Sequence, residues 1–96
     1  MTAHDEHLST FASTTGGVMT EEAGAITGEL ELSCRPEADG VHVKVRYAGA
    51  DEWYTVSGSP VRGLNDPERI LHHLRTPGPV VDGNESAATL EGFAGT

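Results

Sequence analysis

The stretch ELELSCRPEADGVHVKVRY, residues 29–47, decides the fold. Up to Cys34 the apolar side chains alternate with Glu and Ser, and after Gly40 they alternate with His, Lys and Arg. Strict alternation is typical of a strand that buries one of its two faces. Residues 35–40, between the two runs, are rich in residue types that favour turns. The sequence therefore predicts two antiparallel strands joined as a hairpin.

The two predicted strands can be paired so that apolar residues meet on one face and opposite charges meet on the other. Placing Cys34 opposite Val41 brings the leucines and the remaining valines together on one face. The same register sets Glu31 opposite Lys44 on the other face, where opposite charges stabilise facing strands. We therefore expect this register.

A third strand is expected over residues 52–57, the sequence EWYTVS. Aromatic and β-branched residues favour strands, and a short turn separates this run from the predicted hairpin. If Tyr54 and Val56 continue the buried face, Trp53 must point to the opposite side of the sheet, beside Arg46. The sequence thus predicts a tryptophan on the outer sheet face.

One short helix is expected over residues 67–75. Asp66 can accept hydrogen bonds from the first N–H groups, and Pro67 has a backbone angle that suits a helix start. Ile70 and Leu74 are spaced to lie on one side, and the run TPGP after residue 75 ends the helix. This helix is expected to pack on the apolar sheet face.

Together these elements predict an α+β domain over residues 26–78, a three-stranded antiparallel meander followed by one short helix on one face. Residues 1–25 and 79–96 show no sustained period and are rich in small polar residues. We expect them to be a mostly flexible N-terminal segment and a mostly flexible C-terminal tail.

The net charge of the chain disfavours some classes of binding partner. The chain has 6 Lys and Arg against 15 Asp and Glu, a net charge of −9 at pH 7. Such a charge repels phosphate backbones and anionic membranes and attracts basic partners. Most of the excess acid precedes residue 41, so the middle of the chain is close to neutral. Nucleic acid is therefore disfavoured, and it stays as a minor alternative through the middle segment.

The compartment expected from the sequence is the cytoplasm. No apolar run approaches the length that spans a bilayer, and the first residues lack a basic region followed by an apolar one. Cys34 is the single cysteine, so no disulfide can form within the chain. We expect a protein outside membranes.

No catalytic or cofactor motif is present. The sequence has no nucleophile elbow, dinucleotide fingerprint or phosphate loop. The chain contains metal-ligating residue types, but nothing in their spacing makes three or four of them converge. They are His4, His7, His42, His72, His73 and Cys34. We expect no enzyme activity, no metal site and no cofactor.

The outer face of the predicted sheet is the candidate binding site. Aromatic residues and arginine are enriched where proteins bind one another, and charges of both signs set orientation. A structural alternative is that Trp53 only covers the Arg46 side chain. The predicted protein-binding residues are Glu29, Glu31, His42, Lys44, Arg46, Trp53 and Thr55.

These observations favour a small regulatory or adaptor module that binds another protein without catalysis. The alternatives are a nucleic-acid-binding module and, less favoured, a small hydrolase or metal protein. A core this small also predicts a homodimer, through a sheet edge or through the face carrying Trp53.

Overall fold

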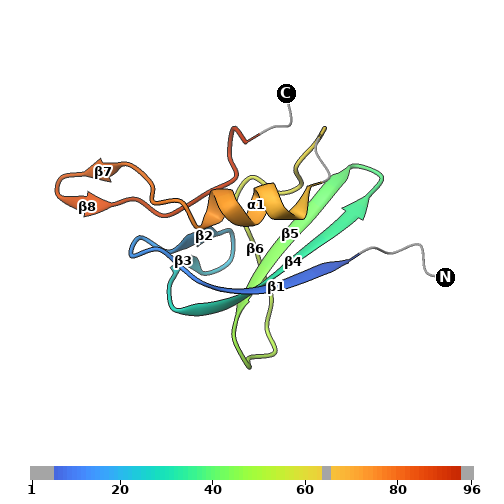
Figure 1. The fold of residues 1–96 in the computed structure, drawn as a ribbon, viewed down its shortest axis with the longest axis horizontal. Helices are drawn as coiled ribbons and strands as arrows, with labels where there is room; N and C mark the ends of the chain where they lie inside the picture. The colour runs from blue at the N-terminus through green and yellow to red at the C-terminus, as the bar shows by residue number, and fades with distance from the viewer. Residues whose placement is uncertain (1–5, 64–65, 94–96) are drawn as a thin grey trace.

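The computed structural model describes residues 6–63 and 66–93. It shows an α+β chain made mostly of strands with one helix (Figure 1). The elements in chain order are β1 (His7–Ala12), β2 (Val18–Thr20), β3 (Gly24–Ile26), β4 (Glu29–Glu37), β5 (Gly40–Tyr47), β6 (Tyr54–Thr55), α1 (Pro67–Leu74), β7 (Val80–Val81) and β8 (Asn84–Glu85).

The main sheet has four strands in the order β1-β4-β5-β6. The predicted three-stranded meander was therefore wrong, although β4, β5 and β6 form its expected core. The additional strand, β1, comes from the segment that was expected to be flexible and pairs antiparallel with β4. Its inward side chains are His7, Ser9 and Phe11, which do not form an apolar stripe, so alternation alone could not reveal it.

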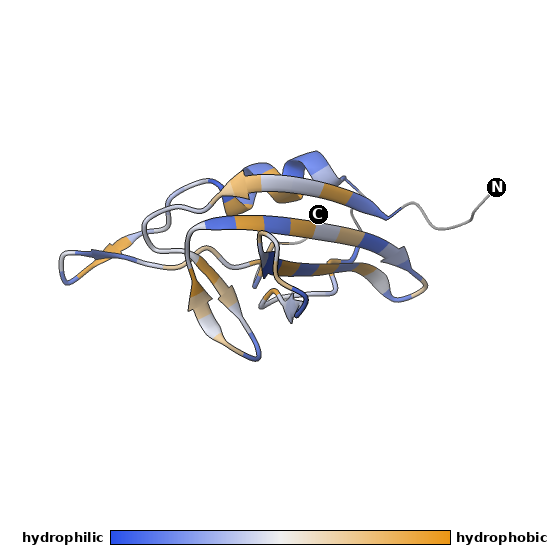
Figure 2. Ribbon diagram, turned by 90° about the horizontal axis from the view of Figure 1, so that it is seen from below, coloured by the Kyte–Doolittle hydropathy of each residue, from blue (hydrophilic) through white to orange (hydrophobic). Residues whose placement is uncertain are grey.

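The predicted β4–β5 register was wrong by two residues. Cys34 lies opposite Val43, and Glu31 lies opposite Arg46 in place of Lys44. The shift by an even number preserves both faces, which is why the predicted sides are correct. Figure 2 shows hydrophobic and hydrophilic residues alternating along the strands. It arises because Pro36 remains in β4, so the turn consists of Ala38 and Asp39 alone.

Pro36 is tolerated in this strand because of where β1 stops. The hydrogen bond from Ala48 N to Glu29 O fixes the alternation, so odd-numbered residues of β4 bond to β5 and even-numbered ones face β1. The described pairing with β1 ends at Cys34. The position at which Pro36 lacks an N–H therefore faces the β1 side, beyond the last described β1 pair. The hydrogen bonds between β4 and β5 do not involve it.

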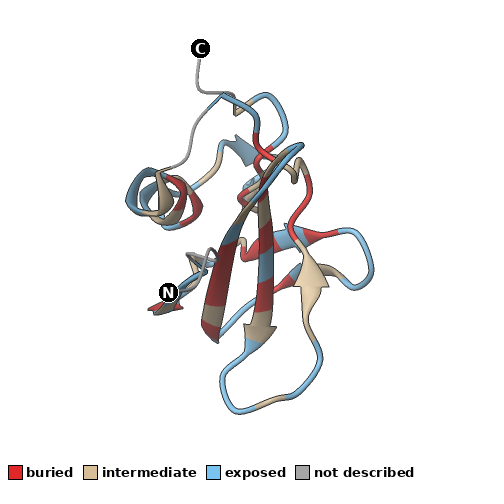
Figure 3. Ribbon diagram, turned by 90° about the vertical axis from the view of Figure 1, so that its right-hand side faces the viewer, coloured by how far each residue is buried: buried red, intermediate tan, exposed pale blue. Residues whose placement is uncertain are grey.

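The third strand is shorter than predicted, since β6 covers only Tyr54–Thr55 of the expected residues 52–57, and α1 ends at Leu74, one residue before the predicted end. Tyr54 pairs with Val45, as predicted, and places Trp53 at the outer face. Helix α1 begins after Asp66, whose side chain accepts from Arg69 N at 3.2 Å, and its buried residues are Ile70 and Leu74. In Figure 3 the buried side of α1 faces the sheet, so the inner face is covered.

The core draws on all parts of the chain. Phe11 and Val18 precede the predicted 26–78 domain, and Leu90 follows it, yet each is at most 5% exposed. The alternation along residues 41–47 also predicts that Tyr47 is buried, yet it is 42% exposed at the end of β5. The expected flexible ends fall partly on residues 1–5 and 94–96, which lie outside the described residues. The described flanks contain β1, β2, β3, β7 and β8.

The segment 86–93 is held by backbone contacts. Ala88 N–H donates to Gly17 O and Leu90 N–H donates to Ser57 O, each at 2.8 Å. Gly16 and Gly58 lie where any β-carbon would collide with this segment. The missing side chains at these two glycines allow the close approach that buries Leu90.

β7 and β8 form a short hairpin beside the body of the molecule (Figure 1). Its turn residues Asp82 and Gly83 have φ of 54° and 80°, the positive pair that suits a two-residue hairpin turn. The Asp-Gly pair between Val81 and Asn84 was the available sequence signal for it. In the described part of the chain, no helix has the length and apolar character needed to cross a bilayer.

Candidate functional site

The outer face of the main sheet is the side opposite α1. Odd-numbered residues of β4 and even-numbered residues of β5 point to it, because successive strand side chains alternate. β6 adds Thr55, and the loop before it adds Trp53. We use the name outer face for the surface formed by these residues.

Arg46 is fixed on the outer face by two partners. Its Nε donates to Glu31 Oε1 at 2.6 Å, and its guanidinium carbon lies 4.4 Å from the centre of the Trp53 ring. The ion pair is half-buried, with both side chains 28% exposed. Arg46 therefore positions the indole of Trp53.

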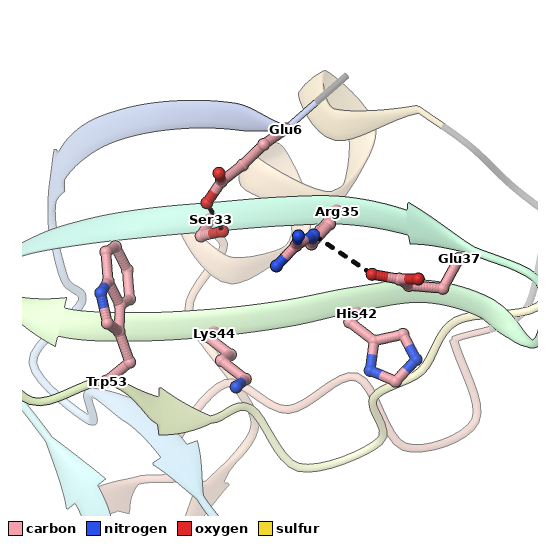
Figure 4. A pocket seen from close by; sticks show the side chains of 7 residues that line it. All are labelled: Glu6, Ser33, Arg35, Glu37, His42, Lys44 and Trp53. Atoms are coloured by element: carbon pink, nitrogen blue, oxygen red, sulfur yellow. Dashed lines mark hydrogen bonds and ion pairs between the residues drawn. The ribbon is translucent and has the colours of Figure 1, made fainter. Parts of the chain in front are cut away.

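A recess of about 240 Å³ is hollowed into this face beside Trp53. Figure 4 shows Trp53 at one end, Glu37 and His42 at the other, and Lys44 between them. β4 and β5 supply most of its lining, and Glu6 reaches over from the start of β1. The lining residues are Glu6, Ser33, Arg35, Glu37, His42, Lys44 and Trp53.

Charge in the recess differs from the acidic average of the chain. Arg35 pairs with Glu37 at 3.2 Å, and Ser33 donates to Glu6 Oε2 at 2.8 Å. Lys44 is exposed and, among the described residues, has no ion pair within 4 Å. The recess thus contains an ammonium group, a guanidinium group and two engaged acids next to an aromatic wall.

His42 is engaged at the far end of the recess. Its Nε2 donates to Asp39 Oδ1 at 2.7 Å, across the turn between β4 and β5. This hydrogen bond lowers the pKa of Asp39 below its ordinary value. The contact orients the imidazole along the strand end, where it closes the recess.

Thr55 is engaged by a carboxylate from another part of the chain. Glu22 accepts from Thr55 N at 2.7 Å and from Thr55 Oγ1 at 2.8 Å. The backbone hydrogen bond is the main cause of a lowered pKa at Glu22, and the hydroxyl adds to it. Thr55 therefore links the outer face to Glu22 and does not line the recess.

Unlike His42, the metal-ligating residues Cys34 and His73 lie away from the recess. Cys34 is fully buried, and burial raises the pKa of its thiol to about 12. On α1, His73 donates from Nε2 to Thr89 O at 2.9 Å and stacks on Phe93. Within residues 6–63 and 66–93, no three His, Cys, Asp or Glu side chains are grouped to hold a metal. His4 lies outside the described residues.

The structure brings together three of the seven predicted residues in the recess, namely His42, Lys44 and Trp53. Glu31 and Arg46 support the Trp53 wall from below, and Glu29 is exposed at the other end of β4. Four lining residues were missed. Ser33 was predicted to point outward but was not among the predicted binding residues. Arg35 and Glu37 would have followed from extending β4 through Pro36, whereas Glu6 depends on the unrecognised strand β1.

The described geometry offers a preformed recess with an aromatic wall and charges of both signs. Comparison with protein-family models, with curated proteins and with solved structures finds no match for this chain.

Proposed function

We propose that this protein is a non-catalytic adaptor or regulatory module that binds a protein partner through the outer face. The partner presents a carboxylate to Lys44 and an apolar side chain to Trp53. The observation that carries the proposal is the fixed indole of Trp53, held over Arg46 at the wall of a recess that contains an exposed lysine.

The fixed side chain of Trp53 supports this proposal. A side chain that is immobilised before binding loses less conformational entropy when a partner arrives. The ion pair of Arg46 with Glu31 and its stacking on Trp53 supply that immobilisation. Half-buried tryptophan is also among the residue types that contribute most to protein interfaces.

The charge pattern defines the partner further. The acidic body of the chain attracts a basic protein at long range, while Lys44 requires a negative group at the contact itself. Glu6 and Glu37 at the rim suit lysine or arginine side chains around that central carboxylate. We therefore infer a partner of net positive charge with one acidic residue in its binding surface.

The test is affinity capture from an extract of the source cells with four versions of the chain. These are the wild type, Trp53→Ala, Lys44→Glu and the control Arg69→Glu, which makes the same charge change on α1. Proteins retained by the wild type and by Arg69→Glu but reduced at least about tenfold with the other two support the proposal. Equal capture by all four versions would remove the outer face as the binding surface.

The same experiment distinguishes a protein partner from the alternative, a nucleic-acid partner. Nuclease treatment of the extract leaves a direct protein contact intact and abolishes retention through DNA or RNA. Nucleic acid retained at low salt and lost with Lys44→Glu would replace the protein partner with a phosphate backbone. Glu31, Glu37 and Asp39 beside the basic residues weaken such a contact.

A further inference from the structure

The two edges of the main sheet differ in how their backbone groups are satisfied. At the β6 edge, Thr55 N–H donates to the Glu22 carboxylate and Thr55 O accepts from Glu21 N at 2.8 Å. Residues 20–22 therefore cover this edge. A sheet edge covered in this way cannot pair with another strand.

The opposite edge, formed by β1, is open among the described residues. Ser13 N–H donates to Gly28 O at 2.9 Å, and this bond fixes which residues of β1 face β4. Because the hydrogen-bonded pairs alternate, Ser9 and Phe11 bond to β4, while Leu8 and Thr10 direct their N–H and C=O groups outward. No described strand lies beyond β1.

None of the usual protections against strand addition is present in β1. Its sequence, HLSTFA, contains no proline, lysine, arginine, acid or glycine. Leu8 is 61% exposed on the outer side of the strand. A six-residue strand without lysine, arginine or acidic residues and with an exposed leucine is therefore available for pairing, in a chain whose net charge is −9.

We propose that two copies of this chain pair antiparallel through β1, with Ser9 opposite Ser9 of the second copy. This register places Leu8 opposite Thr10 of the second copy and uses only residues whose N–H and C=O groups point outward. The two sheets then form one continuous eight-stranded sheet, and each Leu8 becomes covered. A second copy is the occupant because β1 has no lysine, arginine or acidic residue that would repel an identical strand, and pairing about a two-fold axis uses the same edge of both copies.

This proposal is independent of the proposed function, since strand addition uses backbone groups in the plane of the sheet. It also predicts the effect of salt. Two chains of charge −9 repel each other, and salt screens that repulsion over about 10 Å at 0.1 M. Association through a neutral strand therefore strengthens as salt is added, unlike association through opposite charges.

Sedimentation equilibrium of the whole chain tests the pairing from micromolar to millimolar concentrations. The wild type is expected to reach twice the 10.1 kDa of one chain, and at lower concentration when salt is raised. Thr10→Pro removes one outward N–H from each copy without removing a bond within the chain, and it should raise the dissociation constant roughly tenfold or more. Met19→Ser, an uncharged change at an exposed apolar residue of β2, is the control and should leave the mass unchanged.

A second measurement covers the case in which Thr10→Pro does not fold. Ser9→Cys should form an intermolecular disulfide on mild oxidation, because directly opposed residues in a pair without hydrogen bonds are close enough. Thr10→Cys should not, since its two copies are out of register, and buried Cys34 stays unreactive. A single-chain mass at every concentration, a dimer unaffected by Thr10→Pro, or equal cross-linking of the two cysteine variants would overturn the proposal.

Discussion

Gly58 and Leu90 touch through their backbones, although they are far apart in the sequence. Gly58 has φ of +99°, and a β-carbon on it would collide with the backbone of Leu90 and Glu91. The turn after β6 and the segment that follows β8 are therefore packed without any side chain between them.

Gly58→Ala should be strongly destabilising for that reason. Its cost combines the strained positive φ with the collision, and we expect a loss of about 2–5 kcal/mol in the free energy of unfolding. Gly49→Ala is the matched control, since Gly49 also has a positive φ but nothing near its would-be β-carbon. It should lose only about 1–2 kcal/mol. Urea unfolding measures both, and equal losses would show that residue 90 does not pack against Gly58.

Leu90→Ala tests whether the segment after β8 belongs to the core. Leu90 is 1% exposed, and replacing a fully buried leucine by alanine costs about 2–5 kcal/mol. Val80→Ala, at a residue 69% exposed in β7, should change stability by less than about 0.5 kcal/mol. Thermal unfolding followed by circular dichroism compares the two. A Leu90→Ala protein as stable as the wild type contradicts the described core.

Cys34 should be chemically silent in the folded protein. With a thiol pKa of about 12, roughly one molecule in ten thousand carries the thiolate at pH 8, and the side chain is also inaccessible. Ellman's reagent should therefore react with Cys34 only after urea is added. Prompt labelling of one thiol per native chain would be the contrary result.

Glu22 should make stability depend on acid pH. Its pKa is lowered in the folded state by the hydrogen bonds from Thr55, so the stabilisation is present above the ordinary value of 4.5 and is lost as the pH falls through the lower folded value. The Thr55 amide proton should report this protonation in an NMR titration, with a midpoint below 4.5. Glu22→Gln should abolish that titration, whereas Glu21→Gln should leave it in place. A midpoint at or above 4.5 would contradict the contact.

The sequence was most informative where local chemistry decides the structure. Alternation gave the correct faces of β4 up to Cys34 and of β5 from Val41 to Arg46, and Asp66 with Pro67 marked the start of α1. Register was harder because Pro36 has the character of a turn residue, and only the end of β1 makes it acceptable within a strand. β1 itself has a single buried apolar residue, Phe11, and is stabilised by its pairing with β4.

Alternation also predicted part of the recess. Trp53 and Lys44 lie on elements that alternation identifies, so their place on the outer face followed from the pattern. Glu6 reaches the recess only because β1 pairs with β4, and the contact joins residues 27 positions apart. Side chains supplied by such distant pairings leave no periodic trace in a sequence.

The burial of Phe11 and Leu90 in one core bears on how the protein is made. A ribosome releases the chain from its N-terminus, and compact domains usually fold as whole units during or after that release. Here the sheet and α1 have left the ribosome before Leu90 has emerged, so their inner surfaces remain incompletely covered. A chain that stops before residue 90 therefore exposes apolar surface that the whole chain buries, and we expect it to be more prone to aggregation.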